Sequence, residues 1–93
     1  MNDTETASIK TAKASKYLQQ LCKHFGHKAK VEFNPQRGWF EFAFGRADMT
    51  AKPDALTITA AAYNADDLEK LKKVMSSHLE RFAFREDVLI SWR

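Results

Sequence analysis

The chain has 93 residues, of which 44% are hydrophobic and 12% aromatic, as is typical of a single globular domain. Its one cysteine excludes an intramolecular disulfide and suits a reducing compartment. With 15 basic and 12 acidic residues the net charge is only +3, so nucleic-acid binding would require the bases to cluster on one surface. An acidic N-terminus and the lack of a long apolar run lead us to expect a cytoplasmic protein without membrane contact.

The N-terminal third of the chain contains a polar segment followed by a helix. Residues 1–10 are polar and aperiodic, which predicts a flexible segment before a single α+β domain over residues 11–93. From residue 11 to residue 25, one apolar stripe recurs at helical spacing: Ala14, Tyr17, Leu18, Leu21 and Phe25. Gly26 follows the stripe, and we expect the helix to end there.

Four strands are predicted next, because the apolar period changes from helical spacing to two. Apolar and polar residues alternate over residues 29–34, 39–44, 46–52 and 56–63. Turn residues separate these segments at Asn34–Gly38, at Gly45 and at Pro53-Asp54. Short links between half-buried strands predict an antiparallel meander.

The C-terminal third is predicted to form a second helix and a fifth strand. Asn64 is a suitable N-cap, and an apolar stripe follows it: Leu68, Leu71, Met75, Leu79 and Phe82. Val88, Ile90 and Trp92 then alternate as in a strand.

The predicted fold is a two-layer α+β sandwich, with two helices on one face of a mainly antiparallel five-stranded sheet. The predicted element order is helix, four strands, helix, strand. Short links favour antiparallel helices. They place the last strand beside the first, and the alternative is a parallel strand beside the fourth.

Cys22, His24 and His27 resemble metal ligands in the linear sequence, but a helix places Cys22 and His24 about 160° apart around its axis. A structural zinc site needs four converging ligands, and we therefore predict no metal site. His78 would lie near Ala12 or Lys13 if the helices are antiparallel.

A ligand site is predicted at His78, Arg81, Arg85 and Glu86. His78 lies beside the apolar stripe of the second helix, and an imidazole there titrates near neutral pH. Arg81, one turn later, suits a carboxylate or phosphate. The competing interpretation makes these residues structural, with His78 bonded to a neighbour and the arginines in ion pairs.

Two further surfaces stand out in the pattern. The outward side of the first helix is basic: Lys13, Lys16, Gln20, Lys23 and His27. It has no recognition motif for nucleic acid, so we expect no such partner. Trp39 falls on the open face of the sheet, and an exposed aromatic there predicts a homodimer as one partner.

Several segments of the chain resemble those of a bacterial family called domain of unknown function 2218. They are Tyr17–Phe25, His27-Lys28, Ser77–Glu86 and Trp92-Arg93. Similar segments occur attached to siderophore-interacting flavin reductases, so the resemblance implies a link to siderophore and iron metabolism. Because the chain has no flavin or nicotinamide motif, it is similar at most to the accessory segment.

The sequence thus predicts a small cytoplasmic binding or accessory module for an acidic small ligand or a protein partner. No catalytic motif is recognisable, and no cofactor is indicated. A small enzyme using Cys22 or His78 is one alternative. Nucleic-acid binding through the basic face of the first helix is another.

Overall fold

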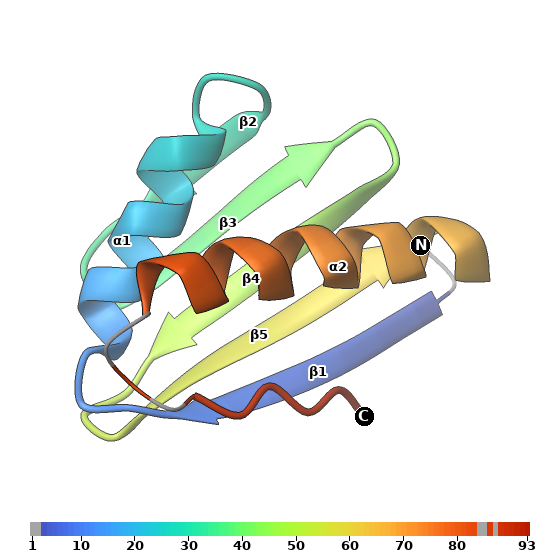
Figure 1. Ribbon diagram of the computed structural model, residues 1–93. Coiled ribbons are helices and arrows are strands. Elements are labelled where there is room, and N and C mark those ends of the chain that lie inside the picture. Colours follow the sequence, from blue (N-terminus) through green and yellow to red (C-terminus); the bar gives the residue numbers. More distant parts are fainter. Residues whose placement is uncertain (1–2, 84–85, 87) are drawn as a thin grey trace.

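The structure, a computed structural model, describes residues 3–83, 86 and 88–93. Seven elements follow one another along the chain: β1 (Asp3–Lys10), α1 (Ala14–Phe25), β2 (Lys30–Phe33), β3 (Arg37–Phe42), β4 (Gly45–Ala51), β5 (Ala55–Ala62) and α2 (Ala65–Phe82). The five strands form one antiparallel sheet in the order β1-β5-β4-β3-β2. Both helices lie on the same face of this sheet (Figure 1), so the predicted α+β class and two-layer architecture are confirmed.

The predicted element order is wrong, because the fifth strand comes from the N-terminus. The segment that we expected to be flexible forms β1, which pairs with β5 along its whole length from Asp3↔Ala62 to Lys10↔Ala55. Its polar composition conceals an alternating pattern in which Ala7 and Ile9 are fully buried. Glu5 also points to the helical side, where it pairs with Lys72 of α2.

The C-terminal residues lie along the outer edge of β1 and do not form the predicted strand beside β2. Trp92 makes a single antiparallel bridge with Ala7. Two backbone hydrogen bonds join Thr6 and Arg93, from Thr6 N to Arg93 O at 3.0 Å and from Arg93 N to Thr6 O at 2.9 Å. The alternative position, beside β5, is occupied by β1, and the chain end pairs with the outer edge of β1.

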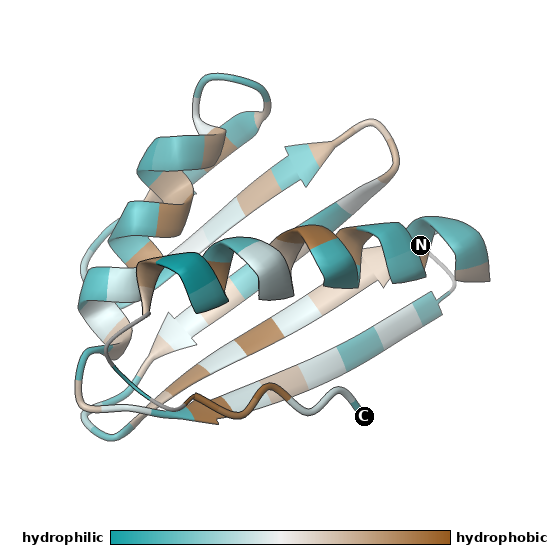
Figure 2. Ribbon diagram, viewed as in Figure 1, coloured by the Kyte–Doolittle hydropathy of each residue, from teal (hydrophilic) through white to brown (hydrophobic). Residues whose placement is uncertain are grey.

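The two faces of the sheet differ in polarity, as the period of two predicted. Phe40, Ala47 and Ala60 are aligned across β3, β4 and β5 and are all completely buried under the helices. Figure 2 shows the resulting alternation of hydrophobic and paler positions along β5. The opposite face carries Trp39 among mainly charged and small polar side chains, and no other element of the described chain covers it.

A close contact between α1 and the sheet is possible only because residue 38 is glycine. A Cβ atom at Gly38 would lie 2.9 Å from Cys22 Sγ and 3.1 Å from Leu18 Cδ2. The missing side chain therefore lets α1 approach β3 closely, with Cys22 in the core.

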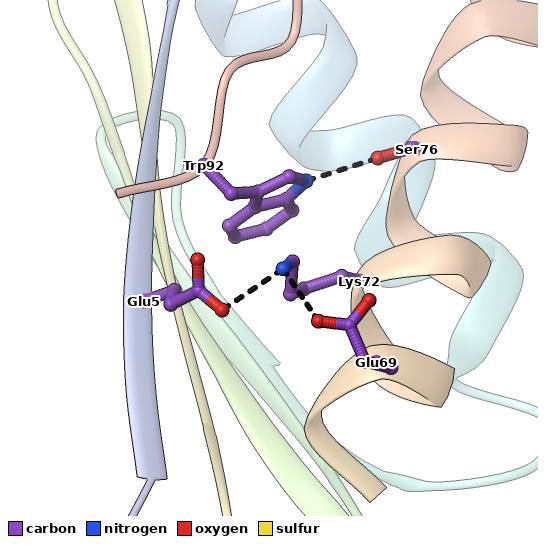
Figure 3. A network of polar contacts seen from close by, with 5 residues as sticks. All are labelled: Glu5, Glu69, Lys72, Ser76 and Trp92. Carbon is purple, nitrogen blue, oxygen red and sulfur yellow. Dashed lines mark hydrogen bonds and ion pairs between the residues drawn. The ribbon is translucent and has the colours of Figure 1, made fainter. Parts of the chain in front are cut away.

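α2 begins at the predicted cap, where the Asp67 amide donates to Asn64 Oδ1 over 2.8 Å. The helix is attached to the β1 edge by a polar network (Figure 3). Lys72 Nζ lies 2.9 Å from a carboxylate oxygen of both Glu5 and Glu69, and Trp92 Nε1 donates to Ser76 Oγ over 3.2 Å. In the described residues, neither helix is long and apolar enough to cross a membrane.

Candidate functional site

α2 crosses the sheet toward α1, and its last turns lie beside that helix (Figure 1). The ring centroids of His24 and His78 are 4.7 Å apart. Phe25 lies 4.8 Å from His78, and Phe82 lies 5.9 Å from His24. We call these four residues the histidine cluster. The expectation that His78 lies near Ala12 or Lys13 is wrong, since it assumed antiparallel helices.

His78 is held by a hydrogen bond within its own helix. Its Nδ1 lies 2.7 Å from the carbonyl oxygen of Val74. A carbonyl oxygen only accepts, so Nδ1 carries the hydrogen and donates it. The neutral ring therefore has its lone pair on Nε2, which is the atom left to meet a ligand. The structural and ligand-binding interpretations of His78 are thus compatible, because each uses a different nitrogen.

The surroundings of His24 are strongly basic. Its pKa is lowered, first by partial burial of its ring and then by the charges of four neighbours: His78, Lys28, Arg81 and His27. Neutral imidazole is therefore the favoured form in the free protein. A bound anion would offset this repulsion and favour a charged His24.

Glu86 lies at a different level of α1 and has its own partners. It accepts hydrogen bonds from Thr11 Oγ1 at 3.1 Å and 3.2 Å and a short one from the Tyr17 hydroxyl. These bonds, that of Tyr17 above all, lower the pKa of Glu86. Burial and the Glu86 charge raise the pKa of Tyr17 to about 12.

The predicted site is therefore divided in the structure. Tyr17 precedes His24 by two helical turns, which is about 10 Å along α1, so Glu86 is well separated from the histidine cluster. His78 and Arg81 both lie near His24, whereas Arg85 falls outside the described residues. His24 is the residue that sequence reasoning missed, because only the crossing of the helices brings it to His78.

Cys22 points away from the histidine cluster, into the core. It is completely buried, and burial raises the pKa of its thiol to about 11. A thiol in such a position is a poor nucleophile at neutral pH. Among the described residues, no group of three or more histidine, cysteine, aspartate or glutamate side chains is placed to hold a metal ion.

The open face of the sheet holds a second feature, around Trp39. The guanidinium of Arg46 lies 4.3 Å from the centre of the indole ring, and Arg46 Nη2 lies 3.0 Å from Asp48 Oδ1. Beside the ring is a shallow depression of about 540 Å³. Its lining comprises Glu32, Phe33, Asn34, Arg37, Gly38, Trp39, Asp48, Met49 and Thr50. Arg46 does not belong to the lining, so the depression opens at another side of the indole.

Comparisons with known proteins agree with this fold. Residues 6–93 match the model of a family described as uncharacterized protein conserved in bacteria, domain of unknown function 2218. The NMR structure of PA4090 from Pseudomonas aeruginosa is similar with a TM-score of 0.82 at 33% sequence identity, covering 97% of this chain and 94% of that chain. No curated protein matches the chain.

Proposed function

The chain belongs to this family of uncharacterized bacterial proteins, and on that premise we propose that it is a binding module for an acidic small ligand or a carboxylate-bearing partner. The binding site is the histidine cluster together with Arg81. The observation that carries the proposal is the contact of His24 with His78, 4.7 Å between ring centroids, where the charges that act on His24 all come from basic residues.

The chemistry of these groups suits an anion. A guanidinium offers a planar fork of donors to a carboxylate or phosphate, and such charge-assisted bonds are about twice as strong as neutral ones. Two adjacent imidazoles add donors once they are protonated. Phe25 and Phe82 lie beside the imidazole rings, while His24 and Arg81 are exposed and accessible to a ligand.

Of the predicted site residues, His78 and Arg81 therefore keep a direct role in the proposal. Arg85, which lies outside the described residues, is to be tested by mutation. Glu86 is reassigned as the residue that attaches the segment after α2 to α1, through Tyr17 and Thr11.

Anionic ferric siderophores are the first ligands to test, since the resemblance to accessory segments of siderophore-interacting reductases favours iron chemistry. We would titrate the purified protein with ferric siderophores, haem and nucleotides by calorimetry. Replacement of Arg81 by Leu should weaken the bound probe at least about tenfold, because a charge-assisted bond contributes about 1.5–3 kcal/mol. Lys52→Leu removes the same charge from an exposed turn and should change affinity less than about twofold.

His78→Gln is a second variant for this experiment, and it should stay folded. The Val74 carbonyl also accepts the helical amide of residue 78, so removing the imidazole leaves no stranded acceptor. Binding should weaken while the free energy of unfolding falls by less than about 1 kcal/mol. If none of the three probe classes binds, or if Arg81→Leu and Lys52→Leu bind equally, the proposal is wrong.

The predicted homodimer concerns the other side of the molecule, the open face of the sheet around Trp39.

A further inference from the structure

We propose that two copies of the chain associate through the open faces of their sheets. The two-fold axis would run in the plane between the two sheets, across the strands and perpendicular to them, at the level of Val31, Phe40 and Ala47. These three residues are aligned across β2, β3 and β4, and their own side chains point to the helical side.

The open face carries its charges in two rows, one on each side of this level. The first row consists of Lys30, Glu41 and Arg46, which are paired in register across β2, β3 and β4. The second row consists of Glu32, Trp39 and Asp48 in the same strands. On β2 and on β4, a base in the first row is therefore followed by an acid in the second.

Rotation about the proposed axis places the first row of one copy opposite the second row of the other. Each strand then lies opposite the same strand of the partner. Lys30 then faces the partner's Glu32, and Arg46 faces the partner's Asp48. Glu41 faces the partner's Trp39, beside Arg46. Opposite charges meet on β2 and on β4, and each contact is formed twice, as an isologous interface requires.

The alternative axis, parallel to β3, would give a very different result. It would set Lys30 against the partner's Arg46 and Glu32 against the partner's Asp48. Both contacts join like charges, which costs binding energy and suppresses that arrangement. The charge pattern thus specifies one relative orientation of two copies.

The rest of the face permits close approach of a second sheet. Across β1 and β5 the outward side chains are small, apart from Lys10 at the end of β1: Thr4, Thr6, Ser8, Thr57, Thr59 and Ala61. On β3, beyond the second row, the proposed axis places the partner's Ala43 opposite Arg37, at the depression beside Trp39. This exposed alanine in the turn between β3 and β4 presents little bulk to the depression.

The size of the face indicates a weak dimer. Five strands at a spacing of about 4.8 Å span about 24 Å, and strands of about six residues are about 20 Å long, so the contact would cover about 500 Å² on each copy. Stable interfaces bury about 800 Å² per partner. We therefore expect a dissociation constant on the order of 100 µM, reached without any contribution from the histidine cluster on the other face.

Charge exchange between two variants tests both the face and the axis. Lys30→Glu alone sets acid against acid in the proposed dimer, and Glu32→Lys alone sets base against base. Each variant should remain monomeric in sedimentation at about 1 mM, where the parent protein is mainly dimeric. An equal mixture of the two variants should dimerise again, because the new acid on β2 of one copy then faces the new base on β2 of the other only in this arrangement.

A matched control is Lys73→Glu, which makes the same charge change on the exposed side of α2 and should dimerise like the parent. A parent protein that is monomeric at about 1 mM overturns the proposal. Dimers of either single variant, or a mixture that stays monomeric beside a dimeric parent, overturn the axis. Because ligand binding is measured separately, failure here leaves the proposed function standing, and the reverse also holds.

Discussion

At the scale of single residues, the most informative result is the position of His24. Its exposed place on α1 makes it resemble an ordinary solvated side chain. The approach of α2 surrounds it with basic groups, which lower its pKa. In the proposed site His24 contributes to anion binding, whereas the linear spacing of Cys22, His24 and His27 resembled only a set of metal ligands.

The first prediction concerns the pH dependence of anion binding. In the free protein the lowered pKa of His24 keeps its imidazole neutral at neutral pH. A bound anion stabilises the protonated form, so binding takes up a proton and affinity should increase as the pH falls below about 6.5. Calorimetry in two buffers of different ionisation enthalpy measures that proton. His24→Gln should flatten the dependence, and an unchanged pH profile in this variant would contradict the assignment.

The second prediction concerns Tyr17 and Glu86. Because the pKa of Tyr17 is raised from 10 to about 12, the protonated hydroxyl makes its full contribution to the stability of the fold below pH 10, and this contribution is lost as the pH rises toward about 12. The pKa of Glu86 is lowered in the folded protein, so its carboxylate stabilises the fold at pH values above the ordinary pKa of glutamate. This contribution is lost as the pH falls through the pKa of Glu86 in the folded protein. Titration of phenolate absorbance should show one tyrosine ionising near pH 12. Tyr17→Phe should remove that step, and its persistence would refute the assignment.

At the scale of elements, the C-terminal segment shows how a part without regular structure can be tightly held. Trp92 is partly buried and packs against the core, and its indole donates a hydrogen bond to Ser76 of α2. Leu89, three residues earlier, is 86% exposed. The alternation that suggested a strand over residues 88–92 thus reports burial of one side of the segment, with only Trp92 in a bridge to β1.

The third prediction separates these two side chains. Trp92→Ala should lower the free energy of unfolding by about 1–3 kcal/mol, since it removes a half-buried indole and its hydrogen bond. Leu89→Ala should change it by less than about 0.5 kcal/mol. Urea denaturation of both variants provides the comparison. Equal effects would mean that the segment does not pack as described.

At the scale of the whole molecule, β1 joins the two ends of the chain into one sheet. It pairs with β5 over eight residues and supports the C-terminal residues on its other side. Ala7 and Ile9 belong to the core. The predicted domain boundary after residue 10 would therefore remove a structural strand.

The fourth prediction follows from this arrangement. Ile9→Ala should cost about 2–4 kcal/mol, because it opens a cavity under the helices. A chain of residues 11–93 alone should lose cooperative unfolding, since that cost adds to the loss of all β1 pairing in a domain of marginal stability. Thermal denaturation followed by circular dichroism distinguishes the cases. A cooperative transition in the shortened chain would mean that the domain boundary predicted after residue 10 is correct.

The sequence alone was sufficient for the features that depend on local periodicity. The helices, the four strands of the meander and the inward side of each strand follow from apolar spacing, because burial on one face imposes that spacing directly. Tertiary structure decided the rest. β1 was concealed because Glu5, on its buried side, is compensated by a lysine 67 residues away, and His24 meets His78 only through the crossing of two helices. Such contacts depend on how elements pack in space, and no local pattern in the chain encodes them.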